Sequence, residues 1–239
     1  MSEVLDRMLA SMRAAWQPIG DWEERDGVGS LVTPAVPQRS VVNCVIYERG
    51  ADLAPAYDRL AARYARVDAW TVWVPEADTA TAEFLARRGH VLDADPAAMV
   101  CDLASFEPPS GLPEWRRATV EQVARVNEVA YPWHDGSMER ALLGAAYGDN
   151  LHLYETEDAC VLGMLDCDGD ATAIFVATVP EARGRGLAGG LLAAALVEAR
   201  ERGNDISTLQ ATKMGEPVYA RIGYERVGAI QMWEKRRDA

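Results

Sequence analysis

The sequence predicts an α/β fold built on a mixed, partly parallel sheet that is flanked by helices. Three observations lead to this class. An apolar strand, an Arg/Gly loop and an alanine- and leucine-rich helix follow one another between Val176 and Arg202. Antiparallel strands joined by the tight turn Asp168-Gly169-Asp170 come before this unit. The same order of elements recurs, more faintly, in the first half of the chain, which indicates a duplicated unit.

The first half shows this copy in abbreviated form. We expect a strand over residues 41–48, a helix over 52–65 and a strand over 70–74. The segment Ala86-Arg87-Arg88-Gly89-His90 then aligns with Ala220-Arg221-Ile222-Gly223-Tyr224, and each is followed by a strand that contains a methionine. Residues 1–105 are therefore expected to form a degenerate domain of the same kind as the second half.

A linker and a complete set of elements follow. Three prolines and a glycine disfavour both helix and strand just after Phe106, so residues 106–114 are predicted to be a linker. In the domain over residues 115–239, Thr119 and Gln122 form a capping box for the first helix. The predicted helices cover 119–130, 138–147, 187–202 and 216–222, and the predicted strands cover 150–155, 159–166, 171–179, 206–211 and 225–235.

Composition limits the classes of function. The chain of 239 residues carries a net charge of −13, which argues against nucleic acid or an anionic membrane as its main partner. The sequence opens without a basic, apolar leader, and no apolar run approaches the ~20 residues of a membrane helix, so we expect a cytoplasmic protein. The four cysteines form no C-x-x-C pair and there are only three histidines, so we expect reduced thiols and no metal site.

The loop before the long helix has the chemistry of a diphosphate cradle. Free N–H groups at a helix N-terminus, glycines and two arginines all favour a bound anion. Gly184 to Gly189 match the dinucleotide pattern G-x-G-x-x-G, but residues 180–183 separate the first glycine from the strand. The acidic residue of that pattern should end the next strand, whereas Asp205 precedes it. A Walker loop is excluded, because no Gly-Lys-Ser/Thr follows. A nicotinamide-binding domain and a glycine turn without a ligand stay as alternatives.

A different pattern, Arg/Gln-x-x-Gly-x-Gly/Ala, is satisfied by Arg183, Gly186 and Ala188. Downstream, residues 214–224 contain Tyr219 and end in glycine followed by an aromatic residue. With one helix and one strand between them, these two motifs resemble the GNAT superfamily of acyl-CoA-dependent N-acetyltransferases. The resemblance covers the second half, and the copy in the first half makes the whole chain similar to a tandem form.

This resemblance implies acetyl-CoA as the acyl donor. The strand over 174–179 would splay from its parallel neighbour, so that its backbone pairs with the pantetheine arm while the loop amides hold the diphosphate. An N–H group of that strand would stabilise the oxyanion that forms when an amine attacks the thioester. The implied cofactor-binding residues are Val176, Ala177, Thr178, Val179, Arg183, Gly184, Arg185, Gly186, Leu187, Ala188 and Gly189.

The resemblance also points to Tyr219 as the general acid that protonates the departing CoA thiolate. No general base is assigned, because Thr172 stands where many family members place a glutamate. The nearby Asp166, Asp168 and Asp170 look like hairpin residues, and a relay of waters is an alternative. The resemblance further implies that the acceptor is a primary amine of a small molecule or peptide. It is expected at a loop that could equally be a packed cap on the core, formed by Tyr131, Trp133, His134 and Asp135.

The first half is not expected to bind the cofactor. Its loop, Arg49-Gly50-Ala51-Asp52, lacks a second glycine and adds a carboxylate, and Leu85 takes the place of Tyr219. This copy would cover the sheet of the second half, shape the amine groove or form a homodimer contact. The sequence thus predicts an N-acetyltransferase that binds one acetyl-CoA per chain and acts by direct attack in a ternary complex. A CoA-binding sensor or scaffold without catalysis is the alternative.

Overall fold

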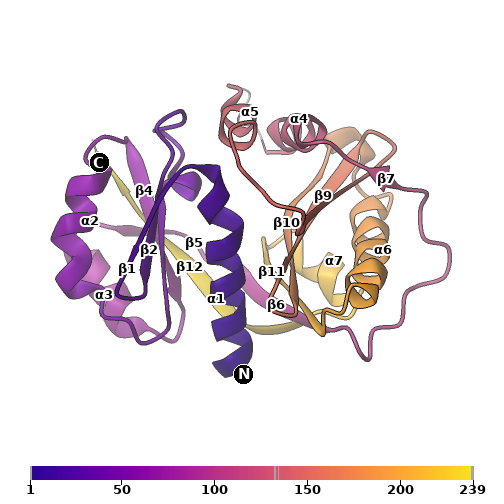
Figure 1. The fold of residues 1–239 in the computed structure, drawn as a ribbon, viewed down its shortest axis with the longest axis horizontal. Helices are drawn as coiled ribbons and strands as arrows, with labels where there is room; N and C mark the ends of the chain where they lie inside the picture. Colours follow the sequence, from indigo (N-terminus) through magenta and orange to yellow (C-terminus); the bar gives the residue numbers. More distant parts are fainter. Residues whose placement is uncertain (1, 132, 134, 238–239) are drawn as a thin grey trace.

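The computed structural model describes residues 2–131, 133 and 135–237, and Figure 1 shows their arrangement. Two α/β halves lie on either side of helix α1 (Ser2–Trp16), and strand β12 (Glu225–Arg236) runs from one half into the other. The mixed, partly parallel sheet flanked by helices that the sequence predicts is confirmed.

In the first half, α1 leads into a β-hairpin that the sequence reasoning did not predict. The strand–helix–strand unit that it did predict follows this hairpin. The predicted helix over 52–65 is shorter in the structure, because Pro55 lies in a separate 3₁₀ turn, Ala54–Ala56. The elements after α1 are β1 (Asp21–Arg25), β2 (Val28–Val32), β3 (Cys44–Tyr47), α2 (Tyr57–Tyr64), β4 (Ala69–Pro75), α3 (Thr79–Arg87), β5 (Val91–Ala94) and β6 (Ala97–Asp102).

In the second half, the observed elements lie close to the predicted ones. The capping box is present: the Thr119 hydroxyl accepts from the Gln122 N–H, and the Gln122 side chain accepts from the Thr119 N–H. The helix predicted over 138–147 ends early, at Leu142, just before Gly144. The elements are β7 (Arg116–Arg117), α4 (Val120–Ala130), α5 (Ser137–Leu142), β8 (Leu151–Thr156), β9 (Cys160–Cys167), β10 (Asp170–Thr178), α6 (Leu187–Glu201), β11 (Ile206–Ala211), α7 (Glu216–Ala220) and β12.

One sheet runs through both halves. In the described part of the chain it has twelve strands, in the order β1-β2-β3-β4-β12-β6-β11-β10-β9-β8-β7, with β5 paired to β12 beside this path. Two neighbouring pairs are parallel, β3–β4 in the first half and β10–β11 in the second. These two pairs correspond to each other in the internal repeat, so the duplication seen in the sequence is also present in the topology.

The two halves exchange a strand. β6 comes from the first half but lies between β11 and β12, and it pairs antiparallel with β11 from Ile206↔Asp102 to Ala211↔Ala97. The C-terminal part of β12 crosses in the opposite direction and pairs antiparallel with β4, from Ile230↔Pro75 to Arg236↔Ala69. Each half therefore completes its sheet with a strand of the other half, and the linker in the sequence does not mark a boundary in the sheet.

Helix α1 packs against both halves. Met8, Leu9 and Met12 are buried in one core cluster with Ile46 of β3 and Val161 of β9. Polar contacts of α1 also reach the second half, since the Ser11 hydroxyl donates to the Asp170 carboxylate at 2.6 Å and Arg7 pairs with Asp205 at 2.5 Å. This shared core and these polar contacts hold the first half against β9 and β10 of the second half.

The linker follows the outside of α6 (Figure 1). Arg200 donates to the carbonyl oxygen of Phe106 at 2.9 Å. A β-carbon built on Gly190 would come within 2.6 Å of the Cδ atom of Pro113. Gly190 therefore allows the linker to approach the helix closely, and it does not face a ligand space.

The remaining expectations from composition concern thiols, metals and membranes. Cys44, Cys101 and Cys160 are free and buried, and Cys167 is free and half-buried. Among the described residues, no group of three or more His, Cys, Asp or Glu side chains is placed to hold a metal ion. None of the described helices combines the length and the apolar character needed to cross a bilayer.

Candidate functional site

The sheet opens between β10 and β11. These parallel strands pair in register only at Asp170↔Ile206, where β10 begins. Their counterparts in the first half, β3 and β4, pair at three consecutive positions, from Cys44↔Thr71 to Ile46↔Trp73. Side chains still connect the strands at Thr172, whose hydroxyl donates to the Thr208 carbonyl, and beyond this point β10 has no partner on β11, as predicted for residues 174–179, so a groove can form there.

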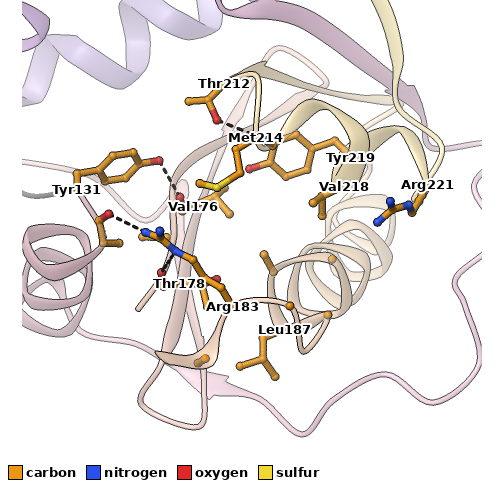
Figure 2. A pocket seen from close by; sticks show the side chains of 18 residues that line it. Tyr131, Val176, Thr178, Arg183, Leu187, Thr212, Met214, Val218, Tyr219 and Arg221 are labelled. Carbon is orange, nitrogen blue, oxygen red and sulfur yellow. Dashed lines mark hydrogen bonds between the residues drawn. The ribbon is translucent and has the colours of Figure 1, made fainter. Parts of the chain in front are cut away.

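A bulge shapes β10 where the strands diverge. The register with β9 shifts between Ile174 and Ala177, so Phe175 and Val176 have no partner in register on β9 or on β11. Phe175 has φ of +54°, an unusual conformation for a bulky residue. Side chains at α4 hold this backbone in place: Asn127 donates to the Phe175 carbonyl at 3.1 Å, and the Tyr131 hydroxyl donates to the Val176 carbonyl at 3.2 Å (Figure 2).

The glycine loop after β10 has the backbone geometry of an anion cradle. Gly184 and Gly186 have φ of +79° and +80°, and Gly186 is the N-cap of α6. A β-carbon at either glycine would meet no atom within 4 Å, so both face open space. Because the first N–H groups of the 15-residue α6 have no partner within the helix, they are available to a bound anion.

The two arginines of the loop are engaged by the protein. Arg183 donates to the carbonyl oxygen of Thr178 at 3.2 Å and to that of Ala130, the last residue of α4, at 2.8 Å. Arg185 pairs with Glu157 at 2.5 Å. The sequence reasoning did not select Arg221, which lines the groove from the end of α7 and whose guanidinium has no hydrogen bond or ion pair within the described part of the chain. Its position within residues 214–224, the second motif of the resemblance, was the signal that could have identified it.

The groove has a volume of about 430 Å³ and lies between β10, the N-terminus of α6 and α7 (Figure 2). Val179 and Arg185 do not line it, since Val179 packs against the core. The predicted cofactor residues that line it are Val176, Ala177, Thr178, Arg183, Gly184, Gly186, Leu187, Ala188 and Gly189. Its far wall contains residues that the sequence reasoning did not select, namely Thr212, Met214, Gly215 and Val218.

Tyr219 stands on α7 with its hydroxyl toward Met214 and Val176 (Figure 2). Its ring packs closely on Gly215, where a β-carbon would come within 2.8 Å of the ring. Burial raises the pKa of the Tyr219 phenol, and the neighbouring Tyr131 and Cys160 raise this pKa further, so the hydroxyl carries its proton at neutral pH. Tyr224 is buried in the core and bonds to Ser207 at 2.6 Å.

The loop predicted to hold the acceptor divides into two parts. Tyr131 and Trp133 line a second cavity of about 640 Å³, and Tyr131 also lines the groove. Asp135 instead accepts from Arg39 at 3.1 Å, from Gln38 at 3.0 Å and from the Ser137 N–H at 3.0 Å. The hydrogen bonds to Ser137 are the main reason that the pKa of Asp135 lies well below its usual range, and its charge is already neutralised by Arg39. His134 lies outside the described residues.

The corresponding place in the first half is packed with side chains. Its two parallel strands stay paired, and Leu85, the counterpart of Tyr219, is fully buried. Between α2 and α3, the rings of Tyr57 and Phe84 meet edge to face at 5.3 Å, and the Arg88 guanidinium covers both rings. The loop residue Arg49 pairs with Asp6 at 2.6 Å. Side chains thus fill the space that in the second half is open.

Comparison with known proteins identifies this architecture. Residues 171–227 match a family model described as an acetyltransferase (GNAT) domain. No curated protein matches the sequence. The fold is similar to a GCN5-related N-acetyltransferase from Kribbella flavida, with a TM-score of 0.68, 16% identity and coverage of 98% of this chain and 96% of that one.

Two further solved structures share the fold. A GCN5-related N-acetyltransferase from Sphaerobacter thermophilus has a TM-score of 0.63 and 14% identity over 98% of this chain and 91% of that one. A tandem GNAT protein from the clavulanic acid biosynthesis pathway has a TM-score of 0.53 and 17% identity over 80% of this chain and 73% of that one. These similarities in fold extend across both halves of the chain.

Proposed function

Since residues 171–227 carry a GNAT acetyltransferase domain and the whole chain has the GNAT fold, we propose that this protein is an acyl-CoA-dependent N-acetyltransferase. Acetyl-CoA is the donor and a primary amine is the acceptor, and both are held at once so that the amine attacks directly. The second half, residues 115–239, binds the donor, and the first half binds none.

The observation that carries this proposal is the opening of the sheet beside the glycine loop. A strand that has left its neighbour offers backbone groups to an extended amide chain such as pantetheine. The loop and the start of α6 offer N–H groups to the diphosphate at one end of that strand. The acyl group is then directed toward the bulge at Phe175 and Val176, where an N–H group can stabilise the oxyanion.

The chemical step follows from these positions. The lone pair of a neutral amine attacks the thioester carbonyl carbon and forms the C–N bond, and the C–S bond then breaks. The CoA sulfur takes the proton of the Tyr219 hydroxyl, the amine nitrogen loses a proton to water, and solvent reprotonates the phenolate. Because the pKa of Tyr219 is raised, this proton transfer is uphill, so it accompanies cleavage of the C–S bond.

A second candidate function is a CoA-binding sensor without catalysis. The residue at the position expected for a general base favours this function, because it is Thr172, which cannot act as a base. Thr172 is buried, and its hydroxyl donates to the Thr208 carbonyl at 3.2 Å. The retained Tyr219 favours the enzyme. Steady-state release of CoA thiol with a panel of amines separates these functions, because a sensor binds acetyl-CoA without turnover.

Gly186→Asp tests donor binding. Acetyl-CoA should raise the melting temperature of the wild-type protein, since a ligand that binds only the native state stabilises it. Gly186→Asp should abolish this rise, because it places a negative charge where the diphosphate would lie. Gly203→Asp is the matched control: Gly203 also has a positive φ, of +98°, and faces open space, but it lies at the other end of α6. An unchanged rise in Gly186→Asp would contradict the assignment of the cradle.

A further inference from the structure

The second cavity, of about 640 Å³, lies between the two halves and meets the groove at the site of the chemical step. Four residues line both spaces: Tyr131, Val176, Thr212 and Tyr219. A molecule in the cavity would therefore reach the bulge of β10 from the side opposite to the glycine loop. The volume is in the range that encloses most of a drug-sized ligand.

Both halves build the walls of this cavity, and the walls are mainly apolar and aromatic. The first half contributes Trp16 from the end of α1, Val41 from the turn before β3, and Trp73 from β4. The second half contributes Trp133 and Phe175, and the Phe175 ring meets the Trp16 ring edge to face at 6.1 Å. Such walls bind a ligand through burial of its apolar surface and through ring contacts.

Few charges face this space. Among the described residues, the charged side chains that line the cavity are Asp93, Asp95 and Lys213. Lys213 lies 3.6 Å from Asp95 and neutralises it, whereas Asp93 forms no ion pair within the described part of the chain. Asp135, next to the cavity wall, is already paired with Arg39. Asp93 is exposed to solvent and lies away from the junction with the groove, so the lining offers few charges to a polycation.

From this lining we infer that the acceptor is a primary monoamine with a bulky, apolar, ring-sized body. This inference rests on the proposed function. The body lies in the cavity between Trp16, Trp73 and Trp133, and the amine lies at the junction near Tyr219 and Val176. The first half thus has a direct role in the reaction, because it forms one side of the acceptor site and selects the acceptor by size and apolar surface.

A panel of amines tests the inference. With 2-phenylethylamine or tryptamine as acceptor, kcat/KM for thiol release should exceed the value with spermidine or glucosamine at least tenfold. When the protein is saturated with CoA, 2-phenylethylamine and tryptamine should also bind more tightly than spermidine and glucosamine. This measurement of Kd requires no turnover. If spermidine or glucosamine is the better acceptor or binds more tightly, the inference is wrong while the proposed acetyltransferase stands. If acetyl-CoA binds but no amine is acetylated, the proposed function fails, and the Kd order alone decides the inference.

Substitutions in the first half locate the binding site. Val41→Trp should fill the cavity and weaken binding of 2-phenylethylamine at least tenfold, with an unchanged Kd for acetyl-CoA, which also shows that the variant is folded. Ala94→Phe repeats the test on β5, which lines another wall. The matched control is Val91→Trp, because Val91 is 63% exposed on β5 and lies outside the cavity. Wild-type amine binding in both cavity variants would overturn the inference.

Discussion

Replacing Asp170 by asparagine should stabilise the protein at neutral pH. Asp170 is fully buried where α1 of the first half meets β10, and two hydroxyls, of Ser11 and Thr208, both donate to its Oδ2 atom at 2.6 Å. Its Oδ1 atom has no partner among the described residues. Burial raises the pKa of this carboxyl from 3.8 to about 6, although the two hydroxyls and Arg7 oppose the shift. Ionisation of this carboxyl is therefore less favourable in the folded protein than in the unfolded chain.

The magnitude follows from linkage between folding and protonation. The folded state binds this proton more tightly than the unfolded state, so the group's favourable contribution is complete below pH 3.8 and is lost as the pH rises through about 6. A shift of this size corresponds to roughly 3 kcal/mol at pH 7.5 and to about half of that at pH 5. Asparagine keeps an oxygen for both hydroxyls and carries no charge, while its amide nitrogen takes the place of the unpartnered Oδ1 and offsets part of the gain. Asp170→Asn should therefore be more stable than wild type at pH 7.5 by up to roughly 3 kcal/mol, and by less at pH 5.

Urea unfolding at pH 7.5 and at pH 5 measures this difference. Asp205→Asn is the control, because Asp205 is mostly exposed and its hydrogen bond to Arg7 lowers its pKa. This control should be destabilised by less than about 1 kcal/mol at both pH values. Equal stability of wild type and Asp170→Asn at pH 7.5, or a difference that does not shrink toward pH 5, would refute the reasoning.

Three other predictions concern Tyr219, the contact between α6 and the linker, and the number of donor sites. Tyr219→Phe keeps the ring and removes the proton, so kcat should fall on the order of 10²-fold while the Kd of acetyl-CoA stays the same; an unchanged kcat would show that another group protonates the thiolate. Gly190→Ala should lower the free energy of unfolding by about 1–3 kcal/mol, because its β-carbon would overlap Pro113, whereas Gly144→Ala, which meets nothing within 4 Å, should not. Isothermal titration should give one acetyl-CoA per chain, because Tyr57, Phe84 and Arg88 fill the counterpart of the groove; two equivalent sites would contradict this.

The features that sequence reasoning predicted are those with local physical causes. A capping box depends on two side chains three residues apart, so Thr119 and Gln122 were sufficient to place the start of α4. A left-handed N-cap needs glycine, and Gly186 before an alanine-rich helix marked the cradle. The turn at Asp168-Gly169 needs positive φ at two positions, which these residues adopt readily.

One feature that it did not predict is local, because the β1–β2 hairpin turns at Asp26-Gly27. The other missed features depend on contacts between distant parts of the chain. Nothing local in β6 indicates that its neighbours are β11 and β12, since the exchange is decided by the assembled sheet. Arg185 looked like a ligand for a diphosphate because its partner, Glu157, is 28 residues away in the sequence. The cavity is likewise invisible in the sequence, because its walls join Trp16 and Trp73 to Phe175 only after folding.

The strand exchange gives a physical reason why a half that does not bind the donor is still required. Without the C-terminal part of β12, β4 would lose its antiparallel neighbour over seven positions, and without β6 the same would happen to β11 over six. Each half alone would therefore expose unpaired backbone groups along an interior strand of the sheet. The exchange also holds Trp73 and Met232 beside each other across the β4–β12 pair, where both line the cavity. The contact that completes the fold of the first half thus also builds its side of the proposed acceptor site.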